Sequence, residues 1–324
     1  MAEKYKTHVG IDVSQKRLDV TILKEGGGQQ RKKCANTLEG IKRLVGWLGQ
    51  KSGGSAHICM EATSVYWEDV AELLHEAGYK VSVVNPVRIK GHGMSQLRRS
   101  KNDPIDGDVI AHFCQTQAPE GWTPPTAEQK KLRALVRHWE ALKKSRTQQK
   151  NRLSTCREEA VRLSIEKVLA TLASEMTDVW QQILDLIDQH PDLHNKKELL
   201  ESIDGFGEKT AVHLLAEMYD LADYHNAKAV AADAGVTTSH HTSGDSVRRR
   251  PKMSRMGKTA VRTALYYPAI TAIRYNAKVK ELAERLTAKG KHKSVIRVAA
   301  MRKLLHIAYG VLKSGQPFDP AFAG

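Results

Sequence analysis

The sequence predicts an α/β N-terminal domain with a mixed sheet, then a long helical segment, then a mainly α C-terminal domain. Short apolar runs alternate with stretches of helical spacing near the N-terminus. Sixty-five residues between Pro125 and Pro191 contain neither proline nor glycine. Apolar residues return at helical spacing in the last third. We therefore expect three regions, 1–124, 125–190 and 191–324.

The N-terminal region has five runs typical of strands and three stretches typical of helices. The first three strands are consecutive and should pair antiparallel, whereas later strand–helix–strand steps give parallel pairing. We thus expect a mixed sheet with helices on its faces. The strands are expected at 8–13, 17–23, 31–35, 57–60 and 81–84, and the helices at 38–48, 65–77 and 104–114.

The net charge of +15 is concentrated in one segment of the chain. Residues 246–306 contain 17 Lys or Arg but only 2 Asp or Glu, while residues 1–245 contain 33 of each sign. Such a block favours a polyanionic partner, because each neutralised phosphate releases counterions. A solvated surface and anionic lipid are the alternatives, and nucleic acid is favoured because the segment is also patterned to fold and carries aromatic residues.

Cysteine usage and hydropathy exclude several classes of protein. Cys34, Cys59, Cys114 and Cys156 are far apart and form no C-x-x-C pair, so neither a disulfide scaffold nor a zinc module is indicated. No apolar run approaches the roughly 18 residues of a membrane span, and the N-terminus lacks an apolar signal core. We expect a cytoplasmic protein.

Four carboxylates fall at the ends of predicted elements. Asp12 ends the first strand, Glu61 follows the fourth, and Asp103 and Asp106 open the 104–114 helix. If strands one and four are neighbours, these side chains converge, and four carboxylates so close repel unless a cation is bound. Mg²⁺ is the natural occupant, and paired metal ions can clamp a phosphodiester.

Each acid also has a simpler explanation. Asp103, Pro104 and Asp106 fit the rules for capping a helix N-terminus. Asp12 taken alone is equally well a turn residue, and Glu61 a cap of the next helix. The metal site is favoured because all four fall at element ends in a suitable order.

The motifs G-I-D-V-S, M-E-A-T and K-N-D-P-I-D resemble those of the ribonuclease H/RuvC-like fold. More closely, they resemble the DEDD insertion-sequence transposases guided by a bridge RNA, which are related to the Piv-type DNA invertases. The resemblance runs from about residue 6 to about residue 312. It assigns the family's four acidic positions to Asp12, Glu61, Asp103 and Asp106, whereas Asp108 lies outside the pattern and is interpreted as a helix-surface residue.

A heptad register fits the long helical segment. Eight of its ten a and d positions are apolar, and the polar pair Arg146 and Gln149 interrupts the seam. We expect an intermolecular coiled coil, with a helix packed within its own chain as the alternative. The resemblance implies a coiled-coil insertion used for dimerisation. The a positions are Leu132, Trp139, Arg146, Leu153 and Ala160, and the d positions are Leu135, Leu142, Gln149, Cys156 and Leu163.

Residues 199–218 are typical of a helix-hairpin-helix, in which two short helices flank Gly205-Phe206-Gly207. The glycine turn and second-helix N-terminus would offer backbone N–H groups to a phosphate. An ordinary helical hairpin is the alternative, and in the family the motif serves largely structure.

The segment Thr237–Ser246 is too polar for a core and precedes the basic block. A serine before glycine is usually a turn residue. The resemblance, however, matches the family's S-G-x-S element to Ser243–Ser246 and its S-K/R-x-G to Ser254–Gly257, and makes Ser243 the nucleophile. Ser246 and Ser239 are fallbacks, and Lys258 stands where the family often has asparagine.

Basic and aromatic side chains around this element are candidates for nucleic-acid binding. His240 and His241 favour phosphate contact or surface over a metal, and Tyr266 and Tyr267 are available for stacking on bases. The expected phosphate-binding residues are Arg248, Arg249, Arg250, Lys252, Arg255, Lys258 and Arg262.

The resemblance implies an RNA-guided DNA recombinase of an insertion sequence in a prokaryotic cytoplasm, associated with the nucleoid. Ser243 would attack DNA beside Mg²⁺ and leave a covalent phosphoserine and a free 3′-hydroxyl. Implied partners are donor and target double-stranded DNA, a noncoding guide RNA and further copies of the chain, as a dimer and as a tetramer in the synaptic complex. The alternatives are a metal-dependent junction nuclease that uses water, and a non-catalytic nucleic-acid-binding scaffold.

Overall fold

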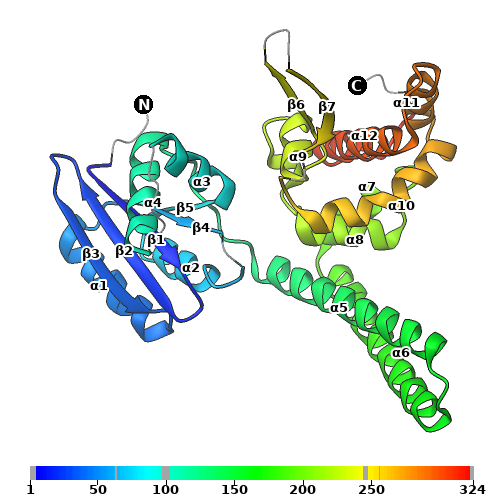
Figure 1. Cartoon of the computed structure of the whole chain (residues 1–324), viewed down its shortest axis with the longest axis horizontal. Coiled ribbons are helices and arrows are strands. Elements are labelled where there is room, and N and C mark those ends of the chain that lie inside the picture. Colours follow the sequence, from blue (N-terminus) through cyan, green and yellow to red (C-terminus); the bar gives the residue numbers. More distant parts are fainter. Residues whose placement is uncertain (1–4, 63, 97–102, 244–246, 255, 322–324) are drawn as a thin grey trace. The chain divides into compact units, whose positions relative to one another are not determined.

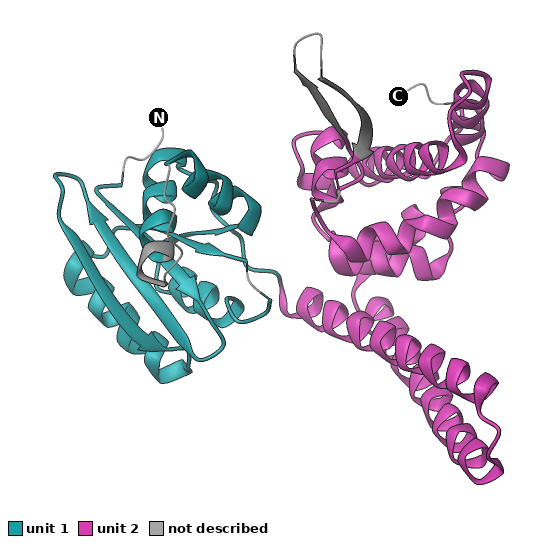
Figure 2. Cartoon of the chain, in the orientation of Figure 1, with its two compact units in different colours: residues 1–125 teal, residues 126–324 magenta. Residues whose placement is uncertain are grey.

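The computed structural model describes residues 5–62, 64–96, 103–243, 247–254 and 256–321. Within these ranges, the side chains of residues 103–106 and 239–252 lie outside the description. The chain divides into two compact units, residues 1–125 and 126–324 (Figures 1 and 2).

The first unit is built on a five-stranded mixed sheet in the order β3-β2-β1-β4-β5. β1 pairs antiparallel with β2 and β2 with β3, whereas β1–β4 and β4–β5 are parallel. The predicted mixed sheet is confirmed, with β1 and β4 as neighbours. The strands are β1 (Thr7–Val13), β2 (Arg17–Lys24), β3 (Gln29–Ala35), β4 (His57–Glu61) and β5 (Lys80–Val84).

Helices cover both faces of this sheet. α1 (Leu38–Ser52) and α2 (Glu68–Glu76) share a core with the alternate residues Val9, Ile11 and Val13 of β1. α3 (Pro86–Ser95) and α4 (Asp103–Gln117) share a core with Cys59 and Val84 on the other face.

Helix α3 is absent from the expected elements, because Asn85-Pro86 was interpreted only as the end of a strand. The Asn85 side chain accepts a hydrogen bond from the Val87 amide, and Pro86 stands in the first turn. Both features start a helix, so the dipeptide closes β5 and opens α3.

The long segment folds into two helices, α5 (Ala127–Thr155) and α6 (Glu159–Asp188), which pack against each other within the chain (Figure 1). The heptad positions of α5 from Leu132 to Leu153 are buried or half-buried. The single register is wrong beyond Cys156, where the helix ends, and Leu163 is 51% exposed. The apolar positions of α5 are therefore covered by α6 of the same chain rather than by a second chain.

The rest of the second unit is mainly helical around a core of leucine, valine and alanine side chains. β6 (Thr238–Ser243) and β7 (Val247–Met253) form a separate antiparallel pair. The helices are α7 (Pro191–Glu201), α8 (Glu208–Glu217), α9 (Ala227–Asp233), α10 (Thr259–Tyr275), α11 (Ala277–Ala288) and α12 (Lys293–Ser314), with a 3-10 turn at Leu221–Asp223.

Candidate functional site

Two of the expected acids lie at the carboxyl end of adjacent parallel strands. The β1–β4 register pairs Gly10 with Cys59 and Ile11 with Met60, so Asp12 and Glu61 are the next residues on their strands. Neighbouring strands lie about 4.8 Å apart, and residues at one level point to the same face. Both carboxylates are half-buried on the face that α4 covers.

Helix α4 approaches this face unusually closely. A Cβ added to Gly10 would lie 2.3 Å from the backbone nitrogen of Ala111 and 2.3 Å from the carbonyl oxygen of Gly107. Only glycine on β1 leaves room for a helix backbone at this distance. The glycine of G-I-D is thus required by packing two residues before Asp12.

The direction of α4 carries its start toward the same end of the sheet. Residues 107 and 111 meet Gly10, whereas the Cys114 thiol donates to the carbonyl of His57, which pairs with His8. α4 therefore runs antiparallel to β1. A rise of about 1.5 Å per residue brings its first residue, Asp103, to about the level of Asp12. The side chains of Asp103 and Asp106 lie outside the described residues.

Two further acids, one on β2 and one on α4, form ion pairs with basic side chains. Asp19 lies opposite Asp12 on β2 and pairs with Arg17 at 2.7 Å and Lys33 at 3.4 Å. Asp19 is therefore a buried ion-paired residue in the structure, next to acids that the sequence assigns to a metal. The sequence analysis did not single it out.

Asp108 is not a helix-surface residue, and that interpretation was wrong. Its side chain is only 13% exposed, and its carboxylate accepts from Arg31 at 2.5 Å, Gln29 at 2.7 Å and Thr21 at 3.0 Å. Burial raises the pKa of Asp108, but these hydrogen bonds outweigh burial and leave the pKa below its ordinary value. Asp108 thus ties α4 to β2 and β3.

The donor set at the end of the sheet suits a hard divalent cation. Asp12 and Glu61 offer carboxylate oxygens from adjacent strands, which is the ligand chemistry that Mg²⁺ prefers. Two carboxylates side by side also repel, and a cation between them relieves that repulsion. The residues present therefore fit the metal that the sequence suggests.

The expected nucleophile lies on the β6–β7 hairpin. Ser243 is the last residue of β6 and pairs with Val247, while Thr242 pairs with Arg248 and His241 with Arg249. The register shifts between Ser239 and His241. The side chains of Ser243, Arg248, Arg249, Arg250 and Lys252 lie outside the described residues, as do all of Ser246 and Arg255.

Two of the expected phosphate-binding cations make contacts inside the protein. Lys258 donates to the carbonyl of Glu217 at 2.9 Å and pairs with Asp233 at 3.1 Å. Arg262 donates to the carbonyls of Ala234 at 3.0 Å and Gly257 at 3.1 Å. These contacts hold the start of α10 against α8 and α9, so part of each cation's hydrogen-bonding capacity is already used.

The glycine turn between α7 and α8 is partly covered. Gly205 has a φ of +101°, and a Cβ there would lie 2.8 Å from Cβ of Ala272 on α10. Asn276 donates to the carbonyl of Asp204 at 3.2 Å. Gly207, the residue before α8, has open space around it. The turn therefore packs on its first side and leaves the α8 N-terminus accessible.

Two tyrosines expected to stack on bases are exposed. Tyr267 is 75% exposed and Tyr266 39% exposed, and their rings meet edge to face. The Arg297 guanidinium of α12 lies over the Tyr266 ring, 5.0 Å from its centroid. This surface of α10 and α12 combines aromatic faces with a cation.

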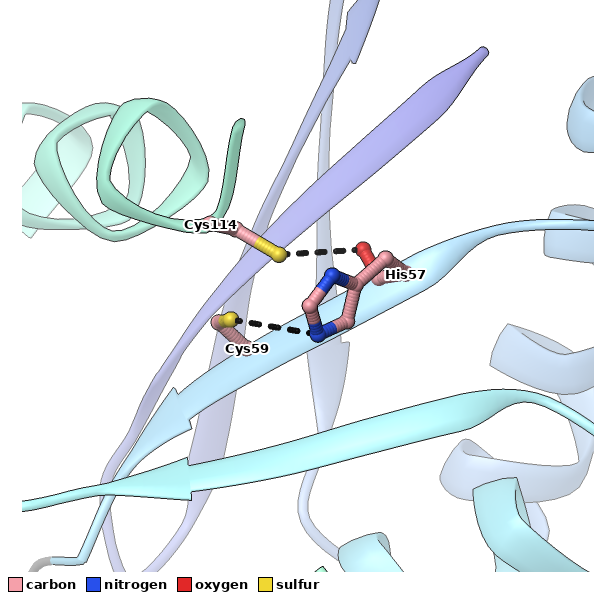
Figure 3. A group of neighbouring side chains, drawn as sticks. All are labelled: His57, Cys59 and Cys114. Carbon is pink, nitrogen blue, oxygen red and sulfur yellow. Dashed lines mark hydrogen bonds between the residues drawn. The ribbon is translucent and has the colours of Figure 1, made fainter. Parts of the chain in front are cut away.

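One cluster escaped the sequence analysis. His57 and Cys59 on β4 meet Cys114 on α4, with ligand atoms all within 4.8 Å of one another (Figure 3). Because Cys59 and Cys114 are distant in sequence, their spacing predicts no site. The available signal was H-x-C on one strand, since alternate residues share a face.

Comparison with known proteins agrees with these observations. Residues 9–160 match the DEDD transposase model of the IS110 type, and residues 197–284 match the transposase IS116/IS110/IS902 family. The pilin gene-inverting protein of Moraxella bovis is 31% identical over 97% of this chain and 98% of its own length. That of Moraxella lacunata is also 31% identical with the same coverage. A transposase for insertion sequence element IS1111A from Coxiella burnetii is 23% identical over 61% of each chain.

Proposed function

The chain belongs to the IS110-type family of DEDD transposases, a family of DNA recombination enzymes, and from that premise we propose how it acts. We propose that it cuts and rejoins DNA strands through a covalent phosphoserine on Ser243, with Mg²⁺ held by Asp12, Glu61, Asp103 and Asp106. The observation that carries the proposal is the meeting of Asp12, Glu61 and the start of α4 at one end of the sheet.

Each part of the proposed reaction has an assigned residue. When bound, Mg²⁺ polarises the scissile phosphate and stabilises the charge that develops on its oxygens. The Ser243 oxygen attacks phosphorus and loses its proton, while the bond to the 3′ oxygen breaks and that oxygen gains a proton. Arg248, Arg249 and Arg250, which follow on β7, neutralise the phosphate. Attack by the 3′-hydroxyl of another strand on the phosphorus of the phosphoserine then rejoins the DNA and releases Ser243.

The proposed substrates are double-stranded donor and target DNA, chosen through a noncoding guide RNA in a prokaryotic cytoplasm. Base pairing by the RNA would select the sequence, so the protein needs backbone contacts rather than a base-reading element. The basic segment 246–306 and the exposed Tyr266 and Tyr267 support nucleic-acid binding of this kind. The guide is testable by itself, because RNA that co-purifies with the protein can be sequenced.

We propose that two chains assemble through the α5–α6 hairpin and that pairs of dimers form the synaptic complex. Val161, Leu163 and Val168 of α6 are 43%, 51% and 42% exposed, although each is apolar. A second copy of the hairpin would cover them. Light scattering on Leu163→Glu should show a shift toward monomer, whereas Arg157→Glu, in the connection between α5 and α6, should leave the dimer intact.

A junction nuclease that uses water remains the alternative, because an acidic site at this end of the sheet needs no serine. The two are separated by an adduct that survives denaturation. The protein would be produced with its native flanking DNA, so that any guide RNA is made, and mixed with Mg²⁺ and element-junction DNA. Wild type should form a protein–DNA adduct that Asp12→Ala and Ser243→Ala do not form.

The other outcomes point elsewhere. Cut DNA without an adduct, unchanged in Ser243→Ala, would identify a hydrolytic nuclease. Tight binding with no cutting by any form, in the presence of co-purified RNA, would support a scaffold.

Along the described residues, no helix is long and apolar enough to cross a membrane.

A further inference from the structure

Three soft donor groups converge in the interior of the first unit. His57 is 1% exposed, and Cys59 and Cys114 are fully buried. The Cys59 sulfur lies 4.0 Å from Nε2 of His57, and the Cys114 thiol donates to the His57 carbonyl at 3.3 Å. The side chains come from β4 and α4 and point toward one another (Figure 3).

The hydrogen bonds around His57 fix which ring nitrogen carries the proton. The Ser82 hydroxyl has one proton and lies 2.6 Å from the Glu120 carbonyl and 3.1 Å from the Pro119 carbonyl. It therefore donates to these carbonyls and accepts from Nε2 of His57 at 2.8 Å. Nδ1 is then the nitrogen with the lone pair. An outer hydrogen bond that sets the tautomer in this way is usual for metal-binding histidines.

The charge of the three donors also suits a divalent ion. A histidine ring that binds a metal ion through its lone pair is a neutral ligand. Two thiolates and one neutral imidazole would together balance the charge of a bound Zn²⁺. A neutral assembly avoids the large penalty for burying net charge. Sulfur and imidazole nitrogen are the ligands that zinc takes in structural sites.

A second histidine lies near the three donors but outside the group whose ligand atoms converge. His8 pairs with His57 across the β1–β4 register, and the two rings lie 6.4 Å apart between centroids. Its Nδ1 is buried without a hydrogen-bond partner among the described residues. A buried nitrogen with no partner costs free energy, so this part of the interior has an unsatisfied donor or acceptor group.

We propose that His57, Cys59 and Cys114 form a structural site for a thiophilic divalent ion, of which Zn²⁺ is the natural example. Binding replaces the two thiol protons, which pass to solvent, with two sulfur–metal bonds and one nitrogen–metal bond. The site is separate from the acidic one, because its donors are soft and Mg²⁺ prefers oxygen.

The position of the site gives it a role. His57, Cys59 and Glu61 alternate along the same face of β4, and α4 runs from Cys114 back to Asp103. An ion bound here would hold α4 against β4 directly behind the carboxylates. It would fix the acids in place without touching the substrate.

The first test is metal content. Wild-type protein would be purified without chelators or a histidine tag, and its zinc content would be measured by inductively coupled plasma mass spectrometry. We expect one Zn²⁺ per chain, lost in Cys59→Ser and in Cys114→Ser. The matched controls are Cys34→Ser and Cys156→Ser, because both cysteines are only partly buried and lie outside the cluster. Asp12→Ala should keep its zinc, which separates this site from the acidic one.

The second test uses wild type alone, so that it holds even if a cysteine variant fails to fold. Cobalt(II) added to metal-free protein should give the visible bands of a tetrahedral site and the near-ultraviolet band of sulfur-to-cobalt charge transfer. Zinc should raise the melting temperature of the first unit. The proposal would be overturned if the protein contained no zinc, gave no sulfur–cobalt band and had the same melting temperature with and without zinc. A disulfide bond between Cys59 and Cys114 in the purified protein would also overturn it.

Discussion

The two regions proposed to form the active site are built on different supports. Asp12 and Glu61 stand on central strands of a five-stranded sheet with helices on both faces, whereas Ser243 ends a strand of a two-stranded hairpin. Metal ligands need fixed spacing, and a buried sheet supplies it. In the proposed mechanism the metal ligands would therefore stand on a sheet with helices on both faces, and the serine on a hairpin of two strands.

Removal of one metal ligand should have the largest effect. Asp12→Asn should lower the rate of strand cleavage by about 10³-fold or more, because the proposed metal site loses a carboxylate. The rate of adduct formation in a quenched-flow assay measures this. Asp19→Asn is the matched control, because Asp19 lies opposite Asp12 but already pairs with Arg17 and Lys33. Equal losses in both variants would mean that the strand end, and not Asp12, matters.

Loss of the nucleophile should be comparable in size but different in kind. Ser243→Ala should abolish the adduct and slow cleavage by about 10³-fold or more, since no other group replaces an attacking oxygen. DNA affinity, measured by mobility shift, should not change. Ser246→Ala and Ser239→Ala are the controls and should both form adduct. If Ser246→Ala behaves instead like the loss of a nucleophile, the assignment moves by three residues.

A side chain added between β1 and α4 should destabilise the first unit. Gly10→Ala places a methyl group 2.3 Å from backbone atoms of α4. Because backbone atoms cannot move aside as a flexible side chain can, the variant should lose about 3 kcal/mol of unfolding free energy. Chemical denaturation of the whole chain measures it. Gly46→Ala is the control, because Gly46 is exposed on α1 with nothing within 4 Å and should gain up to about 1 kcal/mol.

The smallest expected effect is at Asp108. Asp108→Asn should lower stability at neutral pH by about 1 kcal/mol, because its carboxylate is held by Arg31, Thr21 and Gln29. The folded-state pKa lies below the ordinary value of 3.8, so the contribution is present above about pH 4 and is lost as pH falls further. The difference in denaturation midpoint between variant and wild type should therefore be smaller at pH 3 than at pH 7. A difference that is as large at pH 3 as at pH 7 would contradict this origin.

The sheet was predictable because strand periodicity and order are local properties of the sequence. The juxtaposition of Asp12 and Glu61 follows from β1 and β4 being parallel neighbours, which the sequence analysis stated only as a condition. Helix α3 was missed because Asn85-Pro86 both ends a strand and starts a helix.

Features that depend on contacts distant in sequence were not predictable. The turn at residues 156–158 breaks a heptad pattern that continues through it, because α6 packs on α5 with a new set of apolar residues. Asp108 looked like a surface residue because its partners lie on β2 and β3, far away in the chain. The same holds for Cys59 and Cys114. Spacing reveals ligands on one element, and only tertiary packing brings together ligands from two.

The most direct test of the account is to locate the covalent bond. The wild-type adduct would be digested with nuclease and trypsin, and the peptide Ala229–Arg248 analysed by mass spectrometry. We expect a nucleotide remnant on Ser243 in wild type and none in the Asp12→Asn variant. A remnant on any other residue, or cut DNA with an unmodified peptide, would contradict the proposed serine chemistry.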